Sequence, residues 1–325
     1  MINGKNANVL LIGGTGRSGT NLLKNIFSKR SDVYALPFES RFTVDPDGVC
    51  VTYNILKHCW SPMIAEQTIN RFSKFMKMLG KRTFFDEVFI ALQDILRLKG
   101  NIKPYKEWEL DKWLVGFSRK NRELIGSLLW FSYRGGVWPG DNSWLGRDER
   151  EFYGCACLDD CFKYYLNGLY NNTLNYHNKS LYVDDNTFNI LHASTLLELL
   201  PNAKLIHMIR DPRDVVASYI KQRWTPNMLS QAVVYYRHIV EAWKRQRELI
   251  DRSRFIQIKF ESLCLSPKRK LKEACKFMDL DYQDEMMEVY VDSTFVNKWQ
   301  RDLTENQQQL LNRWLKEDVQ EYINE

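Results

Sequence analysis

Runs of apolar residues alternate with amphipathic stretches near both ends of the chain. The first run, residues 9–12, leads into a glycine-rich turn and then into apolar positions at helical spacing. Further strand-like runs occupy residues 31–36, 181–183, 205–209 and 255–260. Strands that alternate with helices predict an α/β fold with a central parallel sheet and helices on both faces.

Between these regions, residues 42–180 follow a different pattern and predict a large, mostly helical insertion. The segment holds six of the ten tryptophans of the chain: Trp60, Trp108, Trp113, Trp130, Trp138 and Trp144. With 325 residues, of which 44% are hydrophobic, the chain can bury a substantial core. We therefore expect a single domain over residues 1–325 that carries the insertion.

The turn after the first strand predicts a P-loop-like, phosphate-binding start. Its glycines are Gly13, Gly14, Gly16 and Gly19. The backbone N–H groups of such a loop, and of the helix that follows it, favour an anion. A nucleotide-hydrolysing P-loop would continue with Lys and then Ser or Thr, but these positions hold Thr20 and Asn21. Arg17 lies within the loop instead, and its guanidinium can hold a phosphate or sulfate without a metal.

A second strand and helix carry further anion-binding side chains. The run 205–209 ends at Arg210, and ligands of open α/β sheets bind where the strands end. Asp211 and Pro212 predict the N-cap and the first residue of the next helix. Ser218 lies inside that helix, so Arg210 and Ser218 can reach one phosphate.

Together the two segments resemble the P-loop-like sulfotransferases, which use 3′-phosphoadenylyl sulfate (PAPS) as donor. The pattern is most similar to the carbohydrate and tyrosylprotein branch. Residues 16–20 resemble the 5′-phosphosulfate loop of the family, and residues 210–218 resemble its 3′-phosphate motif. Residues 259–263 resemble the strand and helix that follow, and residues 297–299 resemble the loop that closes over the cofactor. The resemblance extends over two stretches of the chain, residues 7–41 and 181–322.

The resemblance implies transfer of a sulfuryl group from PAPS to an acceptor hydroxyl, with 3′,5′-ADP (PAP) as product and no metal required. It places the phosphosulfate on the loop and the 3′-phosphate on Arg210 and Ser218. The implied cofactor-binding residues are Gly16, Arg17, Ser18, Gly19, Thr20, Asn21, Arg210, Ser218, Lys298 and Trp299. The insertion at residues 42–180 is the expected acceptor site, because insertions beside a fixed site carry specificity.

In-line transfer of a sulfuryl group requires a cation for the leaving group and a base for the acceptor proton. Arg17 is the expected cation. Glu39 is the expected base, because its Glu-x-Arg segment resembles the one that supplies the base in tyrosylprotein sulfotransferases. The other interpretation of Glu39 is a surface ion pair with Arg41.

The segment after residues 181–183 departs from the family pattern. Relatives typically carry a lysine there that assists the leaving group, whereas this chain has Asp185 at the matching position. Arg17 or Lys298 could take over the role of that lysine. Alternatively, Asp184 or Asp185 acts as the base or orients it, or the site is catalytically weak.

Composition limits the partners that we expect. The net charge of +6 suits anionic cofactors, and no block of like charge suggests a nucleic-acid-binding arm. The first strand begins near residue 8 and no apolar run is long enough to span a bilayer, which predicts a cytoplasmic protein without a signal peptide. Cys155, Cys157 and Cys161 cluster without a neighbouring histidine and predict reduced thiols rather than a metal site.

The sequence leaves the acceptor open. A carbohydrate hydroxyl is the first expectation, followed by a lipid, a phenol or a peptide tyrosine. Two other functions remain. One is a magnesium-dependent P-loop small-molecule kinase, against which Thr20 and Asn21 argue. The other is a pseudoenzyme that binds the cofactor without turnover, which Asp185 would explain.

Overall fold

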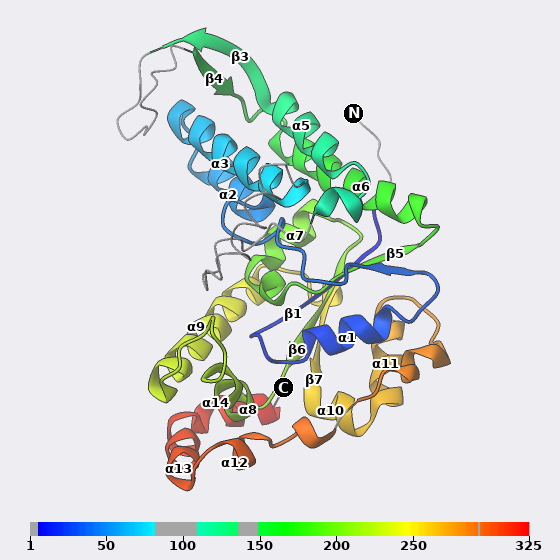
Figure 1. The fold of residues 1–325 in the computed structure, drawn as a ribbon, viewed down its shortest axis with the longest axis vertical. Coiled ribbons are helices and arrows are strands. Elements are labelled where there is room, and N and C mark those ends of the chain that lie inside the picture. The colour runs from blue at the N-terminus through cyan, green and yellow to red at the C-terminus, as the bar shows by residue number, and fades with distance from the viewer. Residues whose placement is uncertain (1–5, 82–108, 136–148, 292, 325) are drawn as a thin grey trace, which may run out of the picture. The chain divides into compact units, whose positions relative to one another are not determined.

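The computed structural model describes four stretches of the chain: residues 6–81, 109–135, 149–291 and 293–324. The chain divides into two compact units. One unit comprises Met1–Ala7 and Ser40–Asn178, and the other comprises Asn8–Glu39 and Lys179–Glu325. The second unit contains the central sheet, whereas the first is mostly helical (Figure 1).

A five-stranded parallel sheet forms the centre of the second unit. Its strands are β1 (Val9–Gly14), β2 (Val33–Ala35), β5 (Leu181–Asp184), β6 (Lys204–Ile209) and β7 (Phe255–Lys259), in the order β2-β5-β1-β6-β7. The central strand β1 is buried along its whole length. Because the chain leaves β1 first toward one edge and later toward the other, the strand order reverses at β1. The carboxyl end of β1 is therefore the switch point where ligands of such sheets bind.

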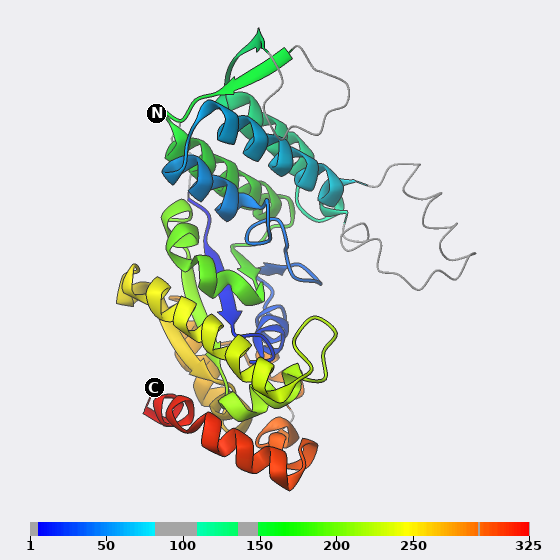
Figure 2. The same ribbon diagram turned by 90° about the vertical axis from the view of Figure 1, so that its left-hand side faces the viewer.

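Helices cover both faces of this sheet, which confirms the predicted α/β class. Figure 2 shows α1 (Thr20–Phe27) on one face and α9 (Leu229–Glu248) on the other. A buried cluster joins the sheet to α1 and α11 (Pro267–Phe277); it includes Leu10, Ile12, Leu23, Ile26, Ile206, Leu271 and Cys275. A sheet that is covered on both faces consists of near-continuous apolar strands, as the sequence pattern here indicates.

Most element boundaries agree with the hydrophobic pattern. Helix α8 (Pro212–Tyr219) begins as predicted, with Asp211 as the N-cap. The Asp211 side chain accepts a hydrogen bond of 2.8 Å from the backbone N–H of Arg213. Strand β2 is shorter than the predicted run 31–36, because residues 31 and 32 form the turn that follows α1.

The remaining helices of the sheet unit precede β6 or follow β7 along the chain. They are α7 (Ala193–Leu199), α10 (Phe260–Leu265), α12 (Trp299–Asp302), α13 (Glu305–Trp314) and α14 (Lys316–Asn324). Short 3₁₀ segments occupy Thr187–His192, Arg252–Arg254, Asp284–Glu288 and Ser293–Phe295. Side chains of α8, α9 and the C-terminal helices share a second buried cluster, which fixes the C-terminal region to the sheet unit.

The other unit is mostly helical but also contains a hairpin. Its helices are α2 (Val49–His58), α3 (Pro62–Gly80), α5 (Phe117–Leu128) and α6 (Leu158–Tyr176), with a 3₁₀ turn at Leu110–Lys112. Strands β3 (Leu129–Arg134) and β4 (Glu149–Tyr153) pair antiparallel. The sequence pattern missed this hairpin because β3 shows no alternation of apolar and polar residues. The rings of Phe131 and Phe152 stack across the two strands at 4.8 Å.

None of the helices in the described stretches combines the length with the apolar composition that crossing a bilayer requires.

Candidate active site

The loop between β1 and α1 turns through three residues with positive φ: Gly16 (83°), Arg17 (59°) and Gly19 (96°). Glycine adopts this region without strain, whereas for arginine it has an energetic cost. At Gly19 a Cβ atom would also lie 2.5 Å from the ring of Phe260, so only glycine fits there. Gly19 is the N-cap residue of α1 and supplies no capping side chain. The first N–H groups of α1 can therefore bind an anion in the loop.

Arg17 and Arg210 meet beside this loop, although 193 residues separate them in the chain. Arg17 donates from Nε to Oγ of Ser218 at 2.9 Å, and Arg210 donates from Nη1 to the backbone oxygen of Arg17 at 3.0 Å. Burial lowers the pKa of Arg17, and the charge of Arg210 lowers it further. The structure thus brings Arg17, Ser218 and Arg210 together. Because two guanidiniums of like charge repel each other, bound anionic groups would stabilise both.

Three further groups hold Arg210 in place. Its Nη2 atom lies 3.3 Å from Oδ2 of the buried Asp214 and donates to the backbone oxygen of Phe295 at 2.6 Å. The guanidinium also lies over the ring of Phe260, 4.6 Å from its centroid. Burial raises the pKa of Asp214, while the Arg210 charge opposes this effect. These contacts fix the arginine at the end of β6.

Two buried polar atoms near the loop lack a hydrogen-bond partner within the described stretches, namely Oγ of Ser18 and Nε of Arg210. A buried polar group without a partner costs about 1–3 kcal/mol, so such groups usually meet water or a ligand. Together with the backbone N–H groups of the loop, they offer several donors in one place. This donor set fits a phosphate or sulfate group.

Lys298 and Trp299 occupy different surroundings. The backbone N–H of Trp299 donates to Oδ1 of Asp214 at 2.7 Å, so Trp299 shares a carboxylate with Arg210. Lys298, in contrast, has its ammonium 3.9 Å from Asp302 and over the ring of Phe295. The structure therefore connects Trp299 to the arginine cluster and directs Lys298 toward Asp302.

Glu39 and Asp185 both follow the carboxyl ends of parallel strands, β2 and β5 respectively. The Oε1 atom of Glu39 accepts a hydrogen bond of 3.1 Å from Oγ1 of Thr187. Asp185 is buried, and its Oδ2 atom lies 3.2 Å from Nζ of Lys24. Burial raises the pKa of Asp185 to about 7; Lys24 opposes this rise, and Asp184 and Glu39 add to it. The edge thus carries two carboxylates in different surroundings, which is how acid and base roles become separated.

The sequence motifs did not single out Lys24 or Thr187. Lys24 belongs to the apolar face of α1, between Leu23 and Ile26, and its side chain is only 4% exposed. A lysine on such a face is buried only when it is paired. The position of Lys24 on the apolar face of α1 was the sequence signal that could have identified this residue.

A second layer of contacts supports the start of α8. The hydroxyl of Tyr322 donates to Oε2 of Glu261 at 2.5 Å, and the backbone N–H of Asp211 donates to Oε1 of the same carboxylate at 3.0 Å. Arg213 donates to both carboxylate oxygens of Asp211 and lies over the ring of Trp299. Glu261 thereby links the C-terminal helix α14 to the turn that carries Arg210.

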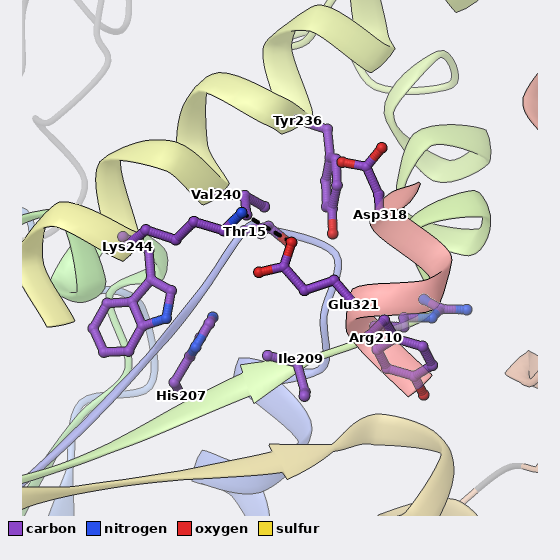
Figure 3. Close-up of a pocket in the computed structure, with 11 residues that line it drawn as sticks. Thr15, His207, Ile209, Arg210, Tyr236, Val240, Lys244, Asp318 and Glu321 are labelled. Carbon is purple, nitrogen blue, oxygen red and sulfur yellow. Dashed lines mark hydrogen bonds and ion pairs between the residues drawn. The ribbon is translucent and has the colours of Figure 1, made fainter. Parts of the chain in front are cut away.

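A cavity of about 30 Å³ lies behind Arg210, between β6, α9 and α14 (Figure 3). Lys244 of α9 and Glu321 of α14 form an ion pair of 2.9 Å across it, and His207 of β6 points toward this pair (Figure 3). Burial lowers the pKa of His207 to about 3, so its imidazole is neutral at pH 7. The volume suits one or two water molecules rather than a substrate.

Fold and site together define a parallel-sheet α/β protein with a glycine loop at the carboxyl end of β1 and Arg210 at the end of the neighbouring strand β6. Residues 146–284 match the model of the sulfotransferase family. The matched region contains the motif at residues 210–218. The matches confirm the resemblance to the P-loop-like sulfotransferase family that the two motifs predicted.

Two curated relatives are protein-tyrosine sulfotransferases. The protein of Drosophila melanogaster is 29% identical over 111 residues, which are 33% of this chain and 22% of the relative. Protein-tyrosine sulfotransferase A of Caenorhabditis elegans is 28% identical over 105 residues, which are 31% of this chain and 28% of the relative. The match thus spans about a quarter of the length of these relatives.

Similar solved structures include the sulfotransferase domain of the Synechococcus olefin synthase, with a TM-score of 0.47, 15% identity and 96% of both chains covered. A sulfotransferase of Mycobacterium avium gives a TM-score of 0.43 at 16% identity, with 97% of this chain and 78% of that chain covered.

Proposed function

We propose that this protein transfers a sulfuryl group from PAPS to an acceptor hydroxyl. The family match supports sulfuryl transfer in general. The observation that carries the proposal is the meeting of Arg17, Ser218 and Arg210 at the ends of β1 and β6. Two fixed guanidiniums beside a glycine loop suit a nucleotide with two separate anionic groups.

In this proposal the loop binds the 5′-phosphosulfate, and Arg210 with Ser218 binds the 3′-phosphate. Lys298 and Trp299 flank the nucleotide. The complete donor-binding set is Gly16, Arg17, Ser18, Gly19, Thr20, Asn21, Arg210, Ser218, Lys298 and Trp299. The unpaired buried atoms of Ser18 and Arg210 support this assignment, because a bound anion would give them a partner.

When bound, PAPS would supply the sulfuryl group and PAP as the leaving group. In this transfer the acceptor oxygen would bond to sulfur, the bond from sulfur to the phosphate oxygen would break, and the acceptor proton would pass to a base. Arg17 would stabilise the negative charge that develops on the phosphate oxygen. Glu39, oriented by its hydrogen bond from Thr187, would accept the proton, and Asp185 is the second candidate for the base.

The acceptor is proposed as a hydroxyl compound. A carbohydrate hydroxyl is the first candidate, and a peptide tyrosine is supported by the two relatives named protein-tyrosine sulfotransferase. A lipid hydroxyl and a phenol are further candidates on the same chemistry. We assign acceptor specificity to residues 42–180, because insertions more often than central sheets carry specificity.

Replacing Arg210 with Ala tests the donor assignment. Loss of a charged, partly desolvated donor is expected to weaken PAP binding roughly 30- to 100-fold, measured by isothermal titration calorimetry. Arg252→Ala is the matched control. Arg252 is exposed and precedes β7, so it lies near the amino ends of the parallel strands, whereas Arg210 follows the carboxyl end of β6. Equal PAP affinity in the Arg210 variant and the wild type would contradict the proposal.

A further inference from the structure

Lys24 and Asp185 form a buried ion pair that the donor-binding motifs do not use. The two side chains are 4% and 3% exposed, and the Nζ–Oδ2 distance is 3.2 Å. Burying two charges costs several kcal/mol per ion before their attraction is counted. An ion pair so placed, at the edge of the sheet that carries the loop, therefore needs an explanation beyond packing.

Several titratable groups surround Asp185. The titratable groups that face it come from α1, β5 and the segment after β2: Lys24, Asp184, Tyr182 and Glu39. Lys24 is the cation among these groups, and Asp184 and Glu39 are carboxyl groups that raise the pKa of Asp185. An anionic ligand beside these carboxylates would be repelled unless a cation turned toward it.

The position of Lys24 allows it to be that cation. It lies one helical turn after Thr20 in α1. Side chains in a helix lean toward its N-terminus, so the long Lys24 side chain runs back toward the loop. Its ion pair with Asp185, directly after β5, shows that the ammonium reaches the carboxyl edge of the sheet.

We propose that Lys24 is a further donor-binding residue, whose ammonium is held by Asp185 until the 5′-phosphate end of the nucleotide occupies the loop and then turns to that anion. This assignment rests on the proposed function. Lys24 would then take the place of the lysine that relatives carry at the position of Asp185. Asp185 is the counter-ion of the buried ammonium.

A proton is linked to this exchange. Asp185 has a pKa of about 7 with Lys24 beside it, and losing that counter-ion raises the pKa further. Near pH 7, Asp185 therefore takes up a proton from solvent when Lys24 turns to the phosphate, which leaves Glu39 rather than Asp185 as the base in the complex. Nucleotide binding should then be accompanied by proton uptake.

The test compares PAP with adenosine 3′-monophosphate, which lacks the 5′-phosphate. Wild-type protein should bind PAP more tightly, and Lys24→Met should reduce this preference about tenfold or more without changing the affinity for adenosine 3′-monophosphate. Lys29→Met is the matched control, because Lys29 follows the same helix but is exposed and pairs with Glu288. An unchanged preference in Lys24→Met overturns the inference. Wild-type protein that binds no PAP overturns the proposed function itself.

Asp185→Asn provides a test of opposite sign. Freeing Lys24 should tighten PAP binding and abolish the proton uptake, measured as the dependence of the binding enthalpy on buffer ionisation. A purely structural ion pair would instead weaken binding when it is broken. If Lys24→Met fails to fold, the double variant Lys24→Met/Asp185→Asn removes both charges together. That variant should lose the same preference for PAP, and a retained preference overturns the inference.

Discussion

Glu39 should be required for turnover but not for binding of the donor nucleotide. Its carboxylate accepts a hydrogen bond from Thr187 and lies after β2, at the edge where the strands end. Replacing Glu39 with Gln keeps the shape but removes the base, so kcat should fall by about 100-fold or more. PAP affinity, measured on the same preparation, should stay unchanged. Retained turnover would move the base to Asp184 or Asp185.

His207 should make stability depend on pH. Its folded pKa is lowered to about 3 by burial, whereas an unfolded histidine titrates near 6.5. The unfolded chain therefore binds the proton first, and the contribution of His207 to stability is fully present above pH 6.5. It is lost as the pH falls from there toward 3.

The measurement is denaturant unfolding at pH 7 and pH 5 of the wild type and of His207→Gln. Because the variant has no group to titrate at this position, its loss of stability between the two pH values should be smaller by about 2 kcal/mol. An equal loss of stability in both proteins would contradict this prediction, because it would show that His207 is protonated in the folded protein as readily as in the unfolded chain.

At the scale of elements, the strand–loop–helix start depends on Gly19. An alanine there would combine a positive φ with a Cβ atom 2.5 Å from the Phe260 ring. We expect Gly19→Ala to lower the free energy of unfolding by about 2 kcal/mol and to weaken PAP binding, because the loop must shift.

Gly126→Ala in α5 is the control for this change. Among the described residues, no atom apart from the chain neighbours and the backbone of the helix itself lies within 4 Å of a Cβ placed there, and alanine favours helix by up to about 1 kcal/mol. It should leave PAP affinity unchanged and stability equal or slightly higher. Wild-type stability and binding in Gly19→Ala would show that the loop tolerates a side chain.

The elements that carry the donor motifs could be predicted because local signals agree there. Apolar runs mark β1 and β6, glycines mark the loop, and the Asp211-Pro212 pair marks the start of α8. The hairpin of β3 and β4 could not, because its strands lack a period of two and pair across residues distant in sequence.

The candidate site shows the same division between local and long-range information. Motif spacing indicated Arg17, Arg210 and Ser218, which the fold brings within hydrogen-bonding distance. The pair of Lys24 and Asp185 depends on how α1 packs against β5, and no sequence spacing encodes that contact. Asp185 looked like the loss of a lysine because its partner lies in another element.

At the scale of the whole molecule, the proposed site binds an anionic nucleotide without the magnesium ion that a nucleotide-hydrolysing P-loop requires. The chain combines a glycine loop, two opposed guanidiniums and a buried lysine on one edge of a parallel sheet. Thr20 and Asn21 occupy the two positions at which a nucleotide-hydrolysing P-loop has Lys followed by Ser or Thr. The arrangement should therefore prefer a 3′,5′-bisphosphate over a magnesium-bound diphosphate.

The most direct measurement is calorimetric titration of the full chain with PAP and, in parallel, with Mg-ADP. We predict tight binding of PAP in the absence of magnesium and weak binding of Mg-ADP. The reverse preference would show that the Arg17 loop is a kinase-type phosphate loop, and it would contradict the sulfotransferase account.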